Sequence, residues 1–210
     1  LRLDTARRFA DLAERCEAAS DGDDAAPIAV DDLLTAVAGA TEFDSVSARS
    51  DEEDAVAAVL GSEGRRAPDD ASAPEQLDAG QRKVLAILRS GMTGTTPTEL
   101  KSDAWVIRQN ALRLLAALRE FLDNLAPARF ANLACRVEAR VEHGISDDAV
   151  GLTAIEGVGA GRASTLAAEG LSTPAEVVRA GVSGLVSAGL SAGVAEQVVA
   201  NAKDLPVVVV

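Results

Sequence analysis

A short glycine-rich segment occurs twice near the C-terminal end of this chain, and it constrains the fold more than any other feature. Residues 157–163 read Gly-Val-Gly-Ala-Gly-Arg-Ala, and residues 189–195, 32 positions later, read Gly-Leu-Ser-Ala-Gly-Val-Ala. Apolar residues at helical spacing flank each copy, and Leu166 after the first corresponds to Val198 after the second. Each copy therefore predicts two short antiparallel helices joined by a tight turn, and the pair predicts one small domain.

The first turn has the chemistry of a phosphate site. Gly157 and Gly159 can adopt positive φ angles and leave the main chain bare. The helix that follows starts with unpartnered amide N–H groups at the positive end of its dipole. Arg162, in the first turn of that helix, is placed to add a charge-assisted hydrogen bond to the same phosphate. The structural alternative is a close-packed helix corner, because short glycine patterns alone are weak signals.

Residues 152–166 resemble a helix-hairpin-helix motif, which in many repair proteins contacts the DNA backbone without sequence specificity. Val194 stands in the second copy where the first has Arg162, so we expect the first hairpin to grip DNA more strongly. The resemblance implies DNA contacts at Gly157, Val158, Gly159, Gly161 and Arg162 of the first hairpin, and at Gly189, Ser191 and Gly193 of the second.

A connecting helix is expected between the two hairpins. Thr173 reads as its N-cap, Pro174 as its first helical residue and Glu176 as the third, which together form a capping box. This helix is expected to run through Ala180.

The composition favours an all-helical fold. Hydrophobic residues make up 48% of the chain but aromatic residues only 2%, and the apolar positions follow helical spacings without any segment typical of a sheet. We expect an all-α protein, with a helical bundle over residues 1–145 and a small double helix-hairpin-helix domain over residues 146–205. No apolar run reaches the ~18 residues of a membrane span and no signal peptide is evident, so a cytoplasmic protein without a membrane partner is expected.

Four helices are expected before residue 91, over residues 4–19, 30–40, 50–60 and 77–90. Ser50 reads as the N-cap of the third, in a capping box with Glu53. Residues 61–74 lack periodicity and are expected to form a mobile loop.

Two smaller features are expected to be structural. Residues 20–24 are rich in aspartate but do not match the spacing of a calcium loop, so a solvated turn is expected there. Cys16 and Cys135 lie among alanine and leucine, and both are expected to be buried free thiols of a reducing compartment.

A long helix is expected over residues 97–125. Thr96, Pro97 and Glu99 read as its capping box, with Thr96 as the N-cap. The apolar side that should pack onto the bundle consists of Ile107, Ala111, Leu114, Leu118, Leu122 and Leu125.

Another side of this helix carries the only tryptophan of the chain. Lys101, Trp105 and Arg108 fall at i, i+4 and i+7 and therefore share one side. An aromatic ring between cations suits sliding contact with single-stranded nucleic acid, because the ring stacks on bases and the cations meet phosphates. The alternative is that Trp105 is a half-buried packing residue. Arg113 and Arg119 are further candidates for contacts with DNA.

The order of a bundle, a long basic helix and paired hairpins resembles the C-terminal part of archaeal superfamily 2 DNA helicases related to the polymerase-theta helicase. The likeness covers nearly all of the chain and is closest at residues 110–115, Asn-Ala-Leu-Arg-Leu-Leu, and at the first hairpin. In that family a ratchet helix lines the channel behind the motor, and the terminal domain grips the emerging strand. The family's stacking aromatic lies nearer the middle of the helix, so the resemblance leaves both Trp105 and Arg113 as stacking candidates.

A net charge of −13 is unusual for a protein that binds nucleic acid. Residues 1–98 hold 10 basic and 20 acidic side chains and residues 99–210 hold 10 and 13, whereas residues 101–140 hold 7 and 4. The acidic balance, the excess of arginine over lysine and the small apolar residues resemble a protein of an extreme halophile. In molar salt the Debye length falls to about 3 Å, so contacts made by backbone amides become comparatively valuable.

The motifs of an ATPase are missing from the sequence. There is no G-x-x-x-x-G-K-[ST] loop, and His143 is the only histidine. The chain is therefore expected to have no catalytic residue, metal site or cofactor of its own, with ATP and magnesium bound by a parent motor. The abrupt start at Leu1 and the apolar end at 207–210 suggest an accessory portion of a larger protein.

The function implied by the resemblance is DNA binding within an ATP-dependent 3′ to 5′ helicase involved in the repair of replication forks. The expected partners are single-stranded or forked DNA and the motor domains of the same parent protein. A protein–protein interaction module with paired docking hairpins is the alternative. A structure-specific nuclease subunit is a third reading, but no motif of catalytic carboxylates supports it.

Overall fold

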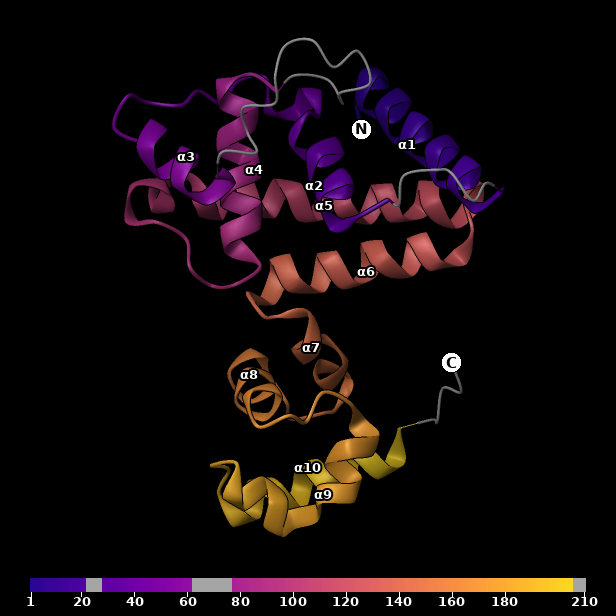
Figure 1. Ribbon diagram of the computed structural model, residues 1–210, viewed down its shortest axis with the longest axis vertical. Coiled ribbons are helices and arrows are strands. Elements are labelled where there is room, and N and C mark those ends of the chain that lie inside the picture. The colour runs from indigo at the N-terminus through magenta and orange to yellow at the C-terminus, as the bar shows by residue number, and fades with distance from the viewer. Residues whose placement is uncertain (22–27, 62–76, 206–210) are drawn as a thin grey trace. The chain divides into compact units, whose positions relative to one another are not determined.

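A computed structural model describes residues 1–21, 28–61 and 77–205 of the chain, and within these ranges it is all-α, as expected (Figure 1). No strand occurs in these ranges, and none of their helices is long and apolar enough to cross a membrane. The chain divides into two compact units, Leu1–Glu142 and His143–Val210.

Unit 1 is a bundle in which one long helix packs against several shorter ones. Its helices are α1 (Leu3–Asp21), α2 (Val30–Ala38), α3 (Glu53–Leu60), α4 (Ala79–Gly91), α5 (Lys101–Leu125) and α6 (Ala128–His143). The expected helices over residues 4–19, 30–40 and 77–90 are thus confirmed within two residues at each end.

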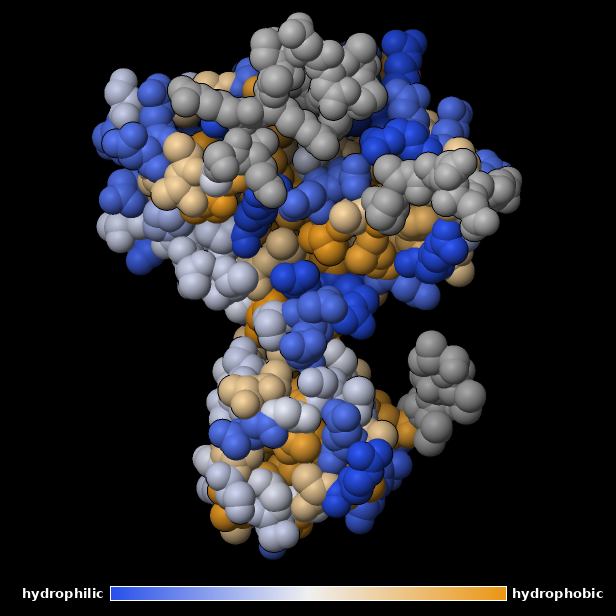
Figure 2. Space-filling view, in the orientation of Figure 1, coloured by the Kyte–Doolittle hydropathy of each residue, from blue (hydrophilic) through white to orange (hydrophobic). Residues whose placement is uncertain are grey.

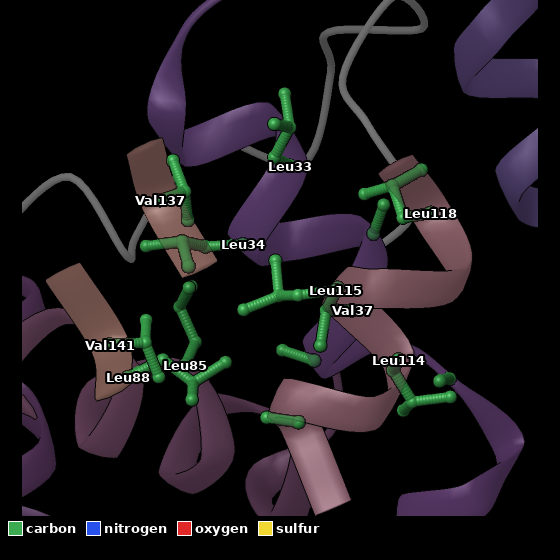
Figure 3. Packing of buried hydrophobic residues seen from close by; sticks show 14 of the residues in the cluster. Leu33, Leu34, Val37, Leu85, Leu88, Leu114, Leu115, Leu118, Val137 and Val141 are labelled. Carbon is green, nitrogen blue, oxygen red and sulfur yellow. The ribbon is translucent and has the colours of Figure 1, made fainter. Parts of the chain in front are cut away.

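The core of unit 1 is formed by the apolar sides of α2, α4, α5 and α6. Leu34, Leu115 and Val137 are fully buried, and in Figure 3 they lie around one cluster with side chains of α4. Burial of each leucine contributes about 1.5–3 kcal/mol. Phe9 of α1 packs edge-on against Phe121 of α5, with the ring centroids 6.0 Å apart, so α1 is fixed onto the same helix.

The long helix begins later than expected. Thr96 is not its N-cap, because Pro97 has an extended ψ of 148° and a 3₁₀ turn over Thr98–Leu100 follows. α5 then starts at Lys101 without a side-chain cap. The side chain of Leu100 is fully buried, so core packing fixes this turn in place of a capping box.

The capping box expected at Ser50 is also wrong, since α3 begins only at Glu53. The preceding turn is held by the carboxylate of Glu52, which accepts hydrogen bonds from the Arg49 N–H at 2.8 Å and the Arg49 guanidinium at 2.7 Å. Local ion pairing has therefore displaced the cap that the sequence suggested.

Three other expectations need correction. Leu125 is 47% exposed because α5 ends there, and Cys135 is exposed because it lies off the buried stripe of α6. Cys16 is buried, and burial raises the pKa of its thiol to about 11.

Of the expected turn over 20–24, the first two residues belong to α1. The rest of that turn, the expected loop from residue 62 and the segment 207–210 lie outside the described residues.

Unit 2 has its own apolar core and a succession of short helices. These are α7 (Asp147–Val150), a 3₁₀ turn (Gly151–Ala154), α8 (Ala160–Ala168), α9 (Pro174–Ser187) and α10 (Ala192–Asp204). The helix expected before the first glycine corner is therefore replaced by α7 and the 3₁₀ turn.

The connecting helix between the hairpins is confirmed. Thr173 accepts a hydrogen bond from the Glu176 N–H at 3.2 Å, and the Glu176 carboxylate accepts one from the Thr173 N–H at 3.0 Å. α9 breaks at Gly181, where φ is 64° and ψ is −173°. The first part of α9 thus ends at Ala180, as expected, and the second part leads into the second glycine corner.

Candidate nucleic-acid interface

The first glycine corner presents the start of a helix without a cap. Gly157 has a φ of 88°, which strongly favours glycine. Gly159 is the N-cap of α8, and its φ of −84° and ψ of 177° show that it is extended and not left-handed. No side chain caps α8, and its first helical backbone bond is donated by Ala163 to the Gly159 carbonyl. The preceding amides of this turn are therefore available to an external acceptor.

Glycines at these helix starts are not required by packing. A Cβ added at Gly159, Gly161 or Gly193 would meet no atom within 4 Å beyond its chain neighbours and its own helix backbone. Gly161 and Gly193 have helical backbones, where glycine is less stable than alanine by about 1 kcal/mol. Neither packing nor backbone geometry accounts for these residues, whereas close approach of a ligand to the main chain would.

The second corner has the same geometry at the corresponding positions. Gly189 has a φ of 97°, and Ser191 is the N-cap of α10 without a side-chain hydrogen bond to the helix. The first backbone bond of α10 is donated by Ala195 to the Ser191 carbonyl, as Ala163 donates to Gly159 in the first copy. The helix starts that follow the two corners therefore repeat in structure as well as in sequence.

Each corner is anchored by one apolar side chain. Val158 of the first corner and Leu190 of the second are both buried in the core of unit 2. The Val158 N–H donates to the Ile155 carbonyl at 2.9 Å. The buried Val158 side chain thus anchors the corner to the core of unit 2. The residues on either side of it, Gly157 and Gly159, are exposed.

Arg162 is exposed and lies against the first corner. Its Nη1 donates to the Gly157 carbonyl at 2.6 Å, which holds the guanidinium beside the free helix start. The equivalent residue in the second hairpin, Val194, is partly buried. The first corner therefore combines free amides with a neighbouring cation, whereas the second has an apolar residue at the equivalent position.

In unit 1, the expected basic side of α5 is open at its N-terminal end. Trp105 is 65% exposed, so the alternative of a half-buried packing residue is wrong. Lys101 is exposed and Arg108 partly so, and neither takes part in an ion pair among the described residues. The ring and the two cations are thus available together.

Arg113 lies on a neighbouring side of the helix, about 80° around the axis from Trp105 at 100° per residue. It is exposed and has no ion-pair partner in the part of the chain that the structure describes. Arg119 is different, because its Nε lies 3.7 Å from Glu138 Oε2 of α6. Of these two candidates, Arg113 is therefore the one whose guanidinium is not paired with a carboxylate in the described residues.

An ion network beneath the start of α5 was not expected from the sequence. Lys83 of α4 is 1% exposed, and its Nζ donates to the fully buried Glu52, to Asp103 and to the Ser47 carbonyl. The single signal for it is that Lys83 shares one side of α4 with Ala86 and Ile87, three and four positions later. The network neutralises Asp103, the acidic residue in the first turn of α5, two positions from Trp105.

The carboxyl groups of this network have shifted pKa values. The hydrogen bond from Lys83 lowers the pKa of Asp103 despite partial desolvation. Burial alone would raise the pKa of Glu52, but hydrogen bonds from Arg49 and Lys83 and their positive charges together lower it. Both groups are therefore ionised at neutral pH.

The other residue that sequence reasoning missed is Asn201 of α10. Its Nδ2 donates to the Glu156 carbonyl, immediately before Gly157, at 2.8 Å. Periodicity gives no signal for a contact between residues this far apart in the chain.

The corner residues and the α5 residues belong to different units, so each set is a candidate interface by itself. Among the described residues, no cluster of three or more His, Cys, Asp or Glu is placed to hold a metal ion.

Comparison with protein families finds a match over most of the chain. The model of the Sec63 Brl domain matches residues 26–208 of this chain. This domain is helical, occurs in Ski2-like superfamily 2 helicases, and is associated with their C-terminal regions. Comparison with curated proteins finds no match.

Proposed function

Because this chain belongs to the Sec63 Brl domain family, we propose a function within a helicase. In this proposal the chain is a DNA-binding C-terminal region of an ATP-dependent 3′ to 5′ DNA helicase. The helicase acts in the repair of replication forks, and this region grips single-stranded or forked DNA through the phosphate backbone. The parent is archaeal, halophilic and related to the polymerase-theta helicase. Its motor domains bind ATP and magnesium and are the protein partner of this chain.

In this proposal the two parts of the chain have different tasks. Residues 1–145 form the bundle that carries the ratchet helix, on which Trp105 stacks against bases and Lys101 and Arg108 meet phosphates. Arg113 is an additional contact with the strand. Residues 146–205 form the helix-hairpin-helix domain, which holds the backbone of the strand without reading its sequence.

The observation that supports the proposal best concerns the glycines at the helix starts. Neither packing nor backbone geometry requires glycine at these positions, and the space where a Cβ would lie is open. Gly159 has an extended backbone that any residue can adopt, and no atom would contact its Cβ. The amides at the start of α8 can therefore approach a phosphate, with the Arg162 guanidinium beside them. In the second corner the amides act without a cation.

Gly159→Val tests the proposed grip. The valine fits the extended backbone and its Cβ lies in open space, so the domain should keep its fold while the side chain covers the amides. We expect the affinity for single-stranded DNA at fixed salt to fall by about tenfold, which corresponds to the loss of about one charge-assisted hydrogen bond. Fluorescence anisotropy of a labelled oligonucleotide measures it. An unchanged affinity in a folded variant excludes the hairpin role.

A protein–protein interaction module is the second candidate. It is favoured by the acidic balance of residues 143–210, which hold three basic and seven acidic side chains, and by the exposure of Trp105 and Val106. Arg162→Ala separates the two functions. It should weaken DNA binding if the first corner holds a phosphate, and it should leave DNA binding unchanged if the hairpins dock on a protein.

A further inference from the structure

The two glycine corners of unit 2 are held in different ways. At the second corner the backbone closes itself, because the Gly189 N–H donates to the Val186 carbonyl and the Leu190 N–H to the Leu185 carbonyl, both at 3.0 Å. These two bonds form a Schellman motif, which needs a regular α-helix before the glycine. The second corner is therefore fixed by its own main chain.

The first corner lacks this closure. A 3₁₀ turn precedes it, and the Gly157 N–H donates to no backbone acceptor among the described residues. The one backbone bond across the turn runs from the Val158 N–H to the Ile155 carbonyl. The peptide unit between Glu156 and Gly157 is thus not held by the backbone.

Side chains supply the missing bonds. Arg162 Nη1 donates to the Gly157 carbonyl at 2.6 Å, from the same hairpin. Asn201 Nδ2 donates to the Glu156 carbonyl at 2.8 Å, from α10 and 45 positions along the chain. The Gly157 and Glu156 carbonyls are therefore both occupied, and the second of these bonds comes from the helix that begins at the second corner.

The bond from Asn201 fixes the direction of an amide as well as a carbonyl. The Glu156 carbonyl and the Gly157 N–H belong to one planar trans peptide, so they point in opposite directions. Holding the carbonyl against Asn201 turns the Gly157 N–H away from α10. A glycine has wide conformational freedom, so this peptide would otherwise rotate easily.

We propose that Asn201 is a positioning residue for the phosphate grip. It orients the Gly157 N–H from the second hairpin and makes the two corners one rigid unit, without touching DNA itself. The inference rests on the proposed function, because it assumes that the first corner holds a phosphate.

Asn201→Ala and Gln197→Ala are the matched pair that tests it. Gln197 lies one turn earlier on α10 and is exposed, so its loss controls for truncating an amide side chain on this helix. In amide NMR spectra of the full chain, Asn201→Ala should shift the Gly157 signal and speed its hydrogen exchange. Gly189, in the self-closed second corner, should not change.

The DNA affinity of Asn201→Ala should fall by about threefold to tenfold, the range of one lost hydrogen bond. Gln197→Ala should bind like the wild type. In a Gly159→Val background, where the corner no longer receives a phosphate, Asn201→Ala should cause no further loss, because the two residues act on one contact.

Asn201→Asp and Gln197→Glu repeat the comparison with size retained and equal added charge. Aspartate cannot donate to the Glu156 carbonyl, so this variant should also lose affinity relative to its control. It keeps the test valid if the alanine variant unfolds.

The outcomes separate the inference from the proposed function. If Gly159→Val lowers affinity but the Asn201 variants bind DNA like their Gln197 controls, the inference is overturned and the hairpin grip stands. An unshifted Gly157 signal also overturns the inference. If Gly159→Val itself leaves affinity unchanged, the proposed function fails, and the role of Asn201 in DNA binding fails with it.

Discussion

At the scale of single residues, a substitution at Gly161 should change the stability of unit 2 and the affinity for DNA in opposite directions. It lies in the first turn of α8 with open space where a Cβ would be. Gly161→Ala should stabilise unit 2 by up to about 1 kcal/mol, because alanine favours the helix. The same methyl group obstructs the approach of a phosphate, so the affinity for DNA should fall. Thermal unfolding and oligonucleotide anisotropy measure the two opposite changes.

Gly193→Ala is the counterpart of this variant in the second hairpin. It should stabilise α10 by a similar amount, but the loss of DNA affinity should be smaller because no cation stands at the position of Val194. A more stable Gly161→Ala variant that binds DNA as the wild type does would contradict the proposed contact.

Trp105 provides a second prediction for a single residue. The residue is 65% exposed, so a soluble quencher such as iodide should reach its ring in the free protein. Stacking on a base should quench its emission and shield it from iodide. Because it is the only tryptophan, the signal reports on this site alone.

Val106→Ala is the control for this experiment, since Val106 is the next residue and is 54% exposed. Trp105→Ala should lower the affinity for single-stranded DNA by about 1–3 kcal/mol, whereas Val106→Ala should have little effect. If DNA leaves the emission unchanged and Arg113→Ala abolishes binding, Arg113 is the stacking residue.

At the scale of the elements, the buried Lys83 connects α3, α4 and the start of α5. Removing it takes away the buried cation of the network and leaves the buried Glu52 carboxylate with only the partly exposed Arg49 as a cationic partner. Lys83→Met should therefore destabilise the protein by about 3–5 kcal/mol. The double variant Lys83→Met with Glu52→Gln removes both charges and should recover much of this loss. Chemical denaturation measures both, and equal stabilities of the two variants would contradict a buried ion pair.

The same network predicts how stability depends on pH. Glu52 and Asp103 have pKa values in the folded protein below their ordinary values of 4.5 and 3.8. Groups with a lowered folded pKa add stability that is complete above the unfolded pKa. This stability is lost as the pH falls through the ordinary values towards the folded ones. The free energy of unfolding should therefore decrease below about pH 4.5, and less steeply in Asp103→Asn, which lacks one of these carboxyl groups.

Most of the helices and the positions of the glycine corners could be predicted from the sequence because they depend on local signals. Apolar periodicity marks α4, and the Thr173 capping box marks the start of α9. The starts of α3 and α5 could not be predicted, because burial of Leu100 and ion pairing of Glu52 override the local cap signals. The contact between Asn201 and Glu156 joins distant segments, so it required the fold itself.

At the scale of the whole molecule, a net charge of −13 opposes association with DNA. The proposed grip reduces this conflict because backbone amides act at contact distance, where their orientation matters more than long-range charge. A more concentrated salt screens the repulsion between the acidic surface and the strand. Salt should therefore weaken binding less than it does for a basic protein.

The proposal predicts how steeply the affinity for DNA depends on salt concentration. The cations proposed to meet phosphates are Lys101, Arg108, Arg113 and Arg162. Each contact with a single strand contributes about −0.7 to the slope of log K against log salt. The slope should therefore be no steeper than about −3, and screening of the acidic surface should make it shallower. A slope near −6 would mean that other arginines, such as those of α6, carry the binding.

Two variants distinguish the contribution of the cations to binding from that of the backbone amides. Arg162→Ala should make it shallower by about 0.7, because one counterion fewer is released. Gly161→Ala should lower the affinity at every salt concentration by a constant factor and leave the slope unchanged, because it obstructs amides without removing a charge. If both variants change the slope equally, the corner acts as a general electrostatic surface. If neither changes the affinity, the strand does not contact the corner.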